Sequence, residues 1–310
     1  MWRYVVKRLL LIFPILLGVS FIVYGIISMT PGDPASSILG TSATQDQIDQ
    51  LNHELGYDQP FFFRYVNYLK DLIFHFDMGE SYRSGTSVIS EIAKRAPISI
   101  RIALNGIICA TVLGIPLGIL SAVKQYSVLD FSSTVIALIL AAVPSFWLGM
   151  MLMLVFALYL GVLPSSGIET WRHYILPMFA IGLPYAAYEL RFTRSTMLEA
   201  IRQDYIRTCR AKGGEERVVI WKHALKNALL PVITVTGNNF GGLLGGAMIT
   251  ETVFSIPGLG TQLVNAIKVK DIPIVMGTTL FLAAFFCLIM VVVDILYALV
   301  DPRIKAKYTK

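Results

Sequence analysis

The stretch DYIRTCRAKGGEERVVIWKHALKNALLP, residues 204–231, is rich in Lys and Arg within a chain that is otherwise strongly apolar. The whole chain of 310 residues is 55% hydrophobic and only 15% charged, and its mean hydropathy is +0.65. A soluble protein of this size needs far more charged residues to cover its surface. The composition therefore predicts a membrane protein, and residues 204–231 are expected to lie outside the bilayer.

Six stretches on either side of this segment are long enough to cross a membrane. A spanning helix needs about 20 apolar residues because the hydrocarbon core is about 30 Å thick. The qualifying stretches are residues 9–29, 98–123, 132–160, 174–192, 229–252 and 273–300. The first resembles a signal peptide, but its apolar core exceeds the roughly 15 residues of such peptides. We therefore expect a retained first helix and an all-α polytopic membrane protein with six transmembrane helices.

The loops between these stretches differ in charge. The N-terminus, residues 124–130, residues 191–228 and the C-terminal DPRIKAKYTK together hold 17 of the 26 Lys and Arg residues. The alternate loops, 30–101, 161–173 and 253–272, hold nine. Cytoplasmic loops collect Lys and Arg, so both termini and the basic segment are predicted to be cytoplasmic.

This topology divides the chain into three parts. Residues 1–30 form the first transmembrane helix. Residues 31–97 form an extracytoplasmic loop with nine acidic and five basic residues, and its aromatic run FFFRYVNYLKDLIFHF favours a small helical element at the membrane surface. Residues 98–310 form a five-helix core that includes a cytoplasmic loop at 193–230.

Several other classes of function are disfavoured. The net charge of +6 is expected for a membrane protein, and no basic stripe carries the interleaved stacking aromatics of a nucleic-acid site. The three cysteines, Cys109, Cys209 and Cys287, show no metal-ligand spacing. The chain contains no HExxH, no GxSxG and no P-loop sequence. We expect neither a metal site nor a catalytic site, and an intramembrane enzyme or a self-sufficient secondary transporter is a weaker interpretation.

The spans contain frequent prolines and glycines and a few charges. Small residues favour tight packing of the bundle, and a movable helix lining a translocation path is also compatible with them. The charged residues Glu189, Arg191 and Asp294 lie near the cytoplasmic ends of their spans. For these three, structural pairing is favoured over a proton relay.

The basic segment itself has helical periodicity with one break. Ile201, Tyr205 and Cys209 are four residues apart and predict one apolar ridge. The glycines at 213–214 predict a turn. A second amphipathic helix is predicted by the spacing of Val218, Trp221, Leu225 and Ala228. Such a hairpin lies either on anionic lipid or in a groove on a protein partner; the glycine break and the mixed charges favour the partner.

These residues resemble the EAA-type coupling loop of bacterial ABC importer permeases, specifically the dipeptide/oligopeptide/nickel permease family. The family pattern is matched by DYIRTCRAKG and HALKNALLPVIT in this loop. Six further motifs match in order: MTPGDPA (29–35), IPLGILSA (115–122), PSFWLG (144–149), LPSSG (163–167), ETVFSIPGLG (251–260) and LVDPRI (299–304). Two positions depart from the family or the general motif. Cys209 replaces the usual Ala, and Arg207 occupies the place of the general motif's Glu.

The resemblance implies a type I importer permease (MetI-like) fold in a bacterial cell membrane. It implies a B-type subunit that pairs with a C-type permease, two ATPase subunits that bind ATP and Mg, and an extracellular binding protein that delivers the substrate. Peptides are the expected substrates, and nickel chelates or other small solutes are the alternative. The chain itself is expected to bind no cofactor, and the mechanism is expected to be alternating access.

Two sets of site residues follow from these motifs. The set that couples the permease to the ATPases is Asp204, Tyr205, Arg207, Arg210, Ala211, Lys212, Gly213, Glu216, His223, Asn227 and Pro231. The set expected to gate the outer mouth or contact the binding protein is Glu251, Phe254, Pro257, Gly258, Leu259 and Gly260. The alternative is that this loop is a simple re-entrant connector.

Overall fold

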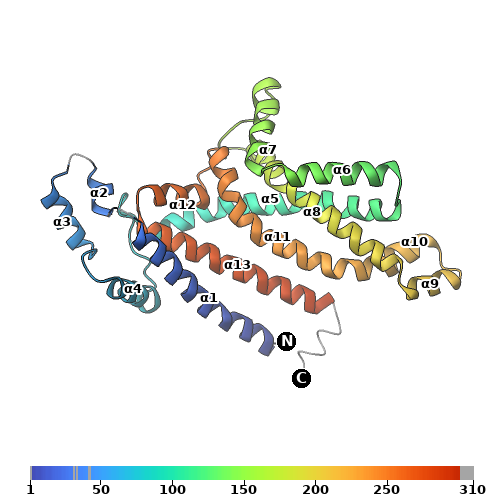
Figure 1. Ribbon diagram of the computed structural model, residues 1–310, viewed down its shortest axis with the longest axis horizontal. Helices are drawn as coiled ribbons and strands as arrows, with labels where there is room; N and C mark the ends of the chain where they lie inside the picture. Colours follow the sequence, from blue (N-terminus) through green and yellow to red (C-terminus); the bar gives the residue numbers. More distant parts are fainter. Residues whose placement is uncertain (1, 31, 33, 41–42, 301–310) are drawn as a thin grey trace. The chain divides into compact units, whose positions relative to one another are not determined.

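The computed structural model describes residues 2–30, 32, 34–40 and 43–300, and nearly all the chain within them is helical (Figure 1). The α-helices are α1 (Trp2–Met29), α2 (Pro34–Leu39), α3 (Gln45–Glu54), α4 (Phe61–Lys70), α5 (Val88–Val123), α6 (Val128–Ala142), α7 (Ser145–Leu152), α8 (Ile175–Ile201), α9 (Asp204–Ala211), α10 (Glu216–Val218), α11 (Leu225–Val253), α12 (Leu259–Lys268) and α13 (Ile272–Val300). Tighter or wider helical turns are η1 (Asp71–His75), η2 (Met153–Tyr159), η3 (Trp171–Tyr174) and η4 (Val219–Ala224). The predicted all-α class is confirmed.

The helices account for most of the predicted spans. Within the described residues, four stretches are long and apolar enough to cross a membrane: Val5–Met29, Val88–Val123, Glu216–Val253 and Ile272–Ile295. A fifth candidate is the bent pair Val128–Ala142 and Ser145–Tyr159. The fourth predicted span, 174–192, lies in α8, where two prolines, Glu189 and Arg191 dilute the apolar residues. The count of six spans and the side on which each terminus lies stay predictions.

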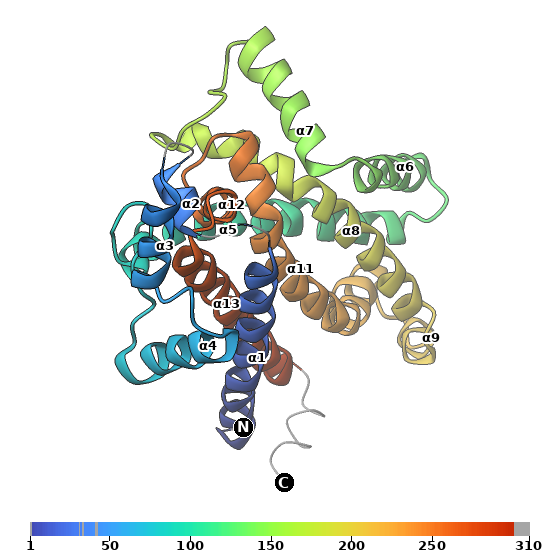
Figure 2. The same ribbon diagram turned by 60° about the vertical axis from the view of Figure 1, so that its left-hand side comes forward.

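The third predicted span, 132–160, is broken into two helices. Helix α6 ends before Val143, which is extended (φ −81°, ψ 126°), and α7 begins after Pro144. The ring of a proline disfavours helical backbone at the residue before it. The two helices therefore meet at an angle of 104°, and Figure 2 shows α7 leaving the end of α6 at this bend.

The chain forms two compact units. Among the described residues, the larger unit contains 2–5, 100–256 and 288–300, and the smaller unit contains 6–99 and 257–287. The long helices α1, α5 and α13 each contribute to both units. The units therefore do not follow the three predicted parts of the chain, which stay a prediction.

Helix α8 is the centre of the larger unit. It packs against α6, α7 and α11 and buries twelve of its residues, and α8 and α11 run side by side in Figures 1 and 2. On another side it meets α5 at glycines. A Cβ on Gly114 would lie 2.6 Å from the carbonyl oxygen of Ala186, and one on Gly118 would lie 2.6 Å from that of Leu190. Only glycine permits two helix backbones to approach this closely, so the tight-packing interpretation of the small residues is confirmed at this contact.

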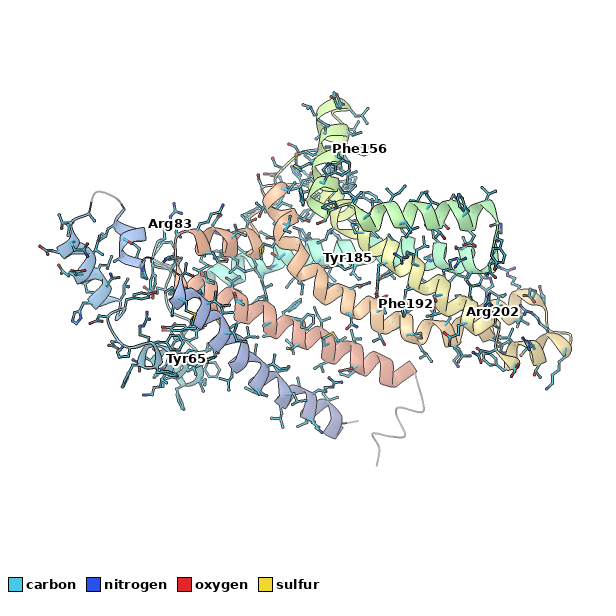
Figure 3. All side chains as sticks on the ribbon, viewed as in Figure 1. Tyr65, Arg83, Phe156, Tyr185, Phe192 and Arg202 are labelled. Carbon is cyan, nitrogen blue, oxygen red and sulfur yellow. The ribbon has the colours of Figure 1, made fainter. Side chains whose placement is uncertain are left out.

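The smaller unit is built on aromatic side chains. Tyr24 of α1 and Tyr65 of α4 are buried with Ile272 and Met276 of α13. Their rings lie 5.5 Å apart, and the Tyr65 hydroxyl lies 2.9 Å from the Ser20 hydroxyl. Figure 3 labels Tyr65 on α4. The helical element predicted within 31–97 is present as α2, α3 and α4, whereas its extracytoplasmic side stays a prediction.

Candidate functional site

The basic segment folds as a short helix, a glycine turn and a second helix. Helix α9 begins at Asp204 after a break at Arg202 and Gln203, and its acidic first residue suits the positive end of the helix dipole. Its anchor is Ile206, which is fully buried among Met197, Ile220 and other apolar residues. The other residues of α9 are exposed or half-buried.

The turn after α9 is a Schellman motif. The amide of Gly213 donates to the Arg210 carbonyl (2.9 Å) and the amide of Gly214 donates to the Cys209 carbonyl (3.1 Å), which is the pairing that defines this helix end. Gly213 has φ +78°, and a Cβ there would meet nothing within 4 Å. A Cβ on Gly214 would lie 2.9 Å from the Cys209 carbonyl oxygen. Gly213 is therefore required for its backbone angle and Gly214 for space, which confirms the predicted break.

Two side-chain contacts join the helices on either side of the turn. Arg210 donates from Nε and Nη2 to the two carboxylate oxygens of Glu216, at 2.9 and 2.6 Å. These hydrogen bonds raise the pKa of the Arg210 guanidinium. Asn227 Nδ2 donates to the Tyr205 hydroxyl at 3.0 Å and to the His223 carbonyl at 3.1 Å. We refer to the Arg210–Glu216 and Tyr205–Asn227 contacts as the clasp.

The clasp brings together four of the eleven predicted coupling residues, and His223 contributes its carbonyl. Ala211, Lys212 and Gly213 form the turn beside it. Asp204 and Arg207 are exposed, with 3.7 Å between their charged groups. Pro231 lies inside α11, away from the turn.

The predicted ridge of Ile201, Tyr205 and Cys209 was wrong, whereas the predicted second helix is present. Ile201 is the last residue of α8 and Tyr205 lies in α9, so the two residues do not lie on one helix. In the second helix the buried residues are Val219, Ile220, Ala224 and Ala228, because the π-helical turn η4 shifts the register of the side chains. Val218 and Trp221, which belong to the predicted apolar side of the second helix, are 42% and 51% exposed.

Apolar and basic side chains therefore share the exposed surface of this segment. Tyr205 is 39% exposed, alongside Val218 and Trp221. The exposed basic residues of the segment are Arg207, Arg210, Lys212, Arg217, Lys222 and Lys226. Exposed aromatic and Arg side chains together are characteristic of protein interfaces.

The second predicted set, around residues 251–260, is mostly buried. Glu251, Phe254 and Leu259 are 0%, 2% and 1% exposed, and Gly258 and Gly260 are also buried. The Phe254 ring would lie 3.1 Å from a Cβ on Gly149 of α7, so it fills the space at that glycine. Pro257 is the exposed member of the set. Contact with a binding protein through the Phe254 or Leu259 side chain would require this region to open, and the role of the set stays a prediction.

The charged residues of the spans differ in their surroundings. Glu189 is fully buried and accepts a hydrogen bond from Asn239 Nδ2 at 3.3 Å, whereas Arg191 is exposed. The strongest pair was missed by sequence reasoning: Arg194 donates to both carboxylate oxygens of Asp130 at 2.6 and 2.9 Å. Asp130 and Arg194 both lie next to the predicted cytoplasmic ends of their spans. This shared position was the sequence signal that could have suggested the pair. Within the described residues, no group of three or more His, Cys, Asp and Glu side chains is arranged to hold a metal ion.

The fold and the exposed hairpin define a multi-pass helical membrane protein with a segment suited to a partner. Two solved structures of the MetNI methionine ABC transporter, both inward facing, share this fold. One has a TM-score of 0.57 at 19% identity and covers 69% of this chain and 97% of its own. The other has a TM-score of 0.56 at 20% identity.

Sequence comparison gives the family. Residues 114–306 match the model of the binding-protein-dependent transport system inner membrane component, and residues 1–103 match the model of its N-terminal region. The chain is 41% identical to the dipeptide transport system permease protein DppB of Alkalihalophilus pseudofirmus, over 98% of this chain and 100% of that one. It is 40% identical to the glutathione transport system permease protein GsiC of Escherichia coli K12, over 99% and 100%. The chain belongs to the binding-protein-dependent transport system inner membrane component family. It is a multi-pass permease of the bacterial inner membrane and not itself a catalytic subunit.

Proposed function

We propose that the chain is the B-type permease subunit of an ATP-driven importer for short peptides. It pairs with a related C-type permease, two ATPase subunits bind and hydrolyse ATP on the cytoplasmic side, and an extracellular binding protein delivers the peptide. The peptide substrate is supported by the dipeptide and glutathione permeases to which the chain is 40–41% identical along its length. No cofactor is assigned to this chain; ATP and Mg belong to the ATPase partners.

The observation that carries the coupling role is the exposed and internally hydrogen-bonded geometry of residues 204–227. The Schellman turn fixes α9 against the second helix, and the clasp adds side-chain contacts across the turn. Ile206 attaches this hairpin to the cluster that contains Met197 of α8 and Ala224 before α11. A force applied to the hairpin is therefore transmitted to two long helices.

This connection suggests a mechanism of alternating access. Closure of the two ATPases moves the hairpin, the hairpin tilts α8 and α11, and the path through the bilayer changes the side to which it opens. The mechanism requires residues 193–230 to be cytoplasmic and residues 31–97 to be extracytoplasmic, as the distribution of Lys and Arg predicts.

Photo-crosslinking tests the docking surface. The assembled importer is purified with a photoreactive phenylalanine analogue at Trp221, which is 51% exposed, or at Phe76 in the smaller unit, which is 80% exposed. We expect Trp221→analogue to crosslink to an ATPase subunit and Phe76→analogue not to do so. Equal crosslinking from both positions, or none from Trp221 in an importer that transports peptide, would reject the assignment of the hairpin.

A further inference from the structure

The smaller unit contains a cavity of about 720 Å³ that the coupling mechanism does not use. It is formed by α1, the turn between α3 and α4, α4 itself, residues 77–82 and the start of α13. We call it the tyrosine cavity, because its walls include Tyr24, Tyr57, Tyr68 and Tyr82. Sites for small molecules usually measure about 300–1,000 Å³ and combine aromatic walls with a few polar groups, so the cavity has the size and the lining of a binding site.

Arg64 of α4 provides the positive charge in this cavity. Its Cζ atom lies 4.1 Å from the centre of the Tyr57 ring, so a cation–π contact holds the guanidinium in place. Its Nε and Nη1 atoms are buried, and neither has a hydrogen-bond partner in the described structure. A buried charged donor that lacks an acceptor is unfavourable. A carboxylate would supply both the opposite charge and the acceptor oxygens, and it is the group that a guanidinium binds best.

A second unused donor lies one helical turn from Arg64. The Tyr68 hydroxyl is buried and also has no hydrogen-bond partner in the described structure. Residues four apart lie on the same face of a helix, and both residues line the cavity. Burial raises the pKa of Tyr68 and of Tyr82, so their hydroxyls stay protonated and can donate. The cavity thus presents a cation and a neutral donor along one wall.

The same cavity has acidic residues in its lining. These are Glu54, Asp71, Asp77 and Glu80, and all four are exposed. Asp77 already accepts a hydrogen bond from the Gly79 amide at 2.8 Å, and Asp71 lies 3.4 Å from His75 Nδ1. An exposed acidic group attracts an ammonium group, whereas the buried guanidinium attracts a carboxylate. One small molecule that carries both groups satisfies both.

We propose that the tyrosine cavity is a binding site for a short zwitterionic peptide on the permease itself. The peptide carboxylate lies at Arg64 and Tyr68, the peptide ammonium faces the acidic side, and the tyrosine rings contact the chain between them. The choice of a peptide and the extracytoplasmic position of the cavity rest on the proposed function. The site would receive a peptide independently of the site on the binding protein.

The test uses the full chain in lipid nanodiscs without the binding protein, and the probe is dialanine. Saturation-transfer NMR and calorimetry measure its binding beside that of its C-terminal amide, which lacks the carboxylate. We expect the amide to bind at least about tenfold more weakly, since it lacks the charged acceptor for the Arg64 guanidinium. We expect Arg64→Gln to weaken dialanine by a similar factor and to abolish the difference between the two ligands.

Arg83→Gln is the matched control, because Arg83 is exposed in the same unit and lines a different, smaller cavity (Figure 3). It should leave the binding of both ligands unchanged. Comparison of the two ligands on the unmodified chain does not depend on whether any variant folds. Equal binding of dialanine and its amide, no binding at tens of millimolar, or an unchanged preference in Arg64→Gln would overturn the proposal.

Peptide uptake by the complete importer separates the two proposals. ATP-driven uptake with the binding protein present, together with no dialanine binding to the permease alone, would reject the cavity and leave the proposed function intact. Dialanine binding that depends on Arg64, together with no peptide uptake by the complete importer, would reject the function and leave the cavity as a carboxylate site.

Discussion

At the scale of single residues, the hairpin depends on one backbone angle. Gly213 adopts φ +78°, in the left-handed region, where a side chain costs on the order of 1–2 kcal/mol and Asn is tolerated better than other residues. A Cβ at this position would meet no atom within 4 Å, so a side chain added at Gly213 is not opposed by steric contact of its Cβ. Substitutions at Gly213 therefore report the backbone conformation alone.

We expect Gly213→Val to reduce ATP-driven uptake at least about fivefold, because strain of about 1–2 kcal/mol opposes the turn. Gly213→Asn should retain at least about half of the uptake. The measurement is peptide uptake in proteoliposomes, with ATP hydrolysis recorded in parallel. In the Val variant hydrolysis should persist or fall while uptake is lost, and normal uptake would show that the turn does not couple the subunits.

Single residues also show where sequence reasoning reached its limit. The pair of glycines was sufficient to predict the turn. Glycine suits the positive φ angle at Gly213 and the lack of room for a Cβ at Gly214. The pair Asp130–Arg194 was not predictable in the same way, since its members are 64 residues apart and meet only when α6 packs on α8. Glu189 was identified as a buried charge, but its partner Asn239 lies on α11.

At the scale of elements, the contact between α5 and α8 depends on small residues at regular spacing. Gly114 and Gly118 are four residues apart and lie on one face of α5, against the backbone of α8. In contrast, Gly25 of α1 is also helical, and a Cβ there would meet nothing within 4 Å. Gly118 and Gly25 are both helical glycines, and only Gly118 lacks room for a methyl group, so alanine at the two positions makes a matched comparison.

We expect Gly118→Ala to destabilise the protein by about 1–3 kcal/mol. The added methyl group would overlap the backbone of α8, which cannot move aside as a side chain can. Gly25→Ala should be neutral or stabilising by up to about 1 kcal/mol, since alanine favours a helix over glycine. Thermal unfolding in detergent of a purified chain whose half-buried Cys209 and Cys287 are replaced by alanine, followed through reaction of the buried Cys109 thiol with a dye, measures both. Equal unfolding midpoints for the two variants would contradict the close approach of α5 and α8.

The π-helical turn η4 changes which side chains of the second helix are exposed. The spacing of Val218, Trp221, Leu225 and Ala228 predicted that these four residues share the apolar side of an amphipathic helix. The π-helical turn η4 adds a residue to that turn and exposes Val218 and Trp221 instead. Periodicity alone carries no signal for such a change, and the turn places Val219 and Ile220 in one buried cluster with Met197 and Ala200.

At the scale of the whole molecule, the predicted topology assigns each part of the chain to one side of the membrane. The positive-inside rule predicts that residues 31–97 and the coupling hairpin lie on opposite sides. Gln50 of α3 and Lys222 of η4 are exposed and represent the two parts. Cysteine introduced at each of them provides a direct measurement of topology.

In a chain whose three cysteines are replaced by alanine, Gln50→Cys should react with a membrane-impermeant maleimide in intact spheroplasts, and Lys222→Cys should react only in inverted vesicles. The expected difference in labelling is at least about tenfold, because the hydrocarbon core of the bilayer excludes the charged reagent. Transport of peptide by each variant serves as the control for folding. Labelling of both cysteines from the same side would refute the predicted topology.

The sequence by itself determined the all-α membrane class, the glycine turn and the family, because hydropathy, the special backbone freedom of glycine and ordered motifs are local properties of the chain. Only the tertiary structure decided the bend at Pro144, the burial of Phe254 and Leu259, the exposure of Trp221 and the pairing of Asp130 with Arg194. It also brought Arg64 and the tyrosines of separate elements around one cavity. These features depend on contacts between residues far apart in the chain, and the free energy of such contacts is fixed by packing rather than by local sequence.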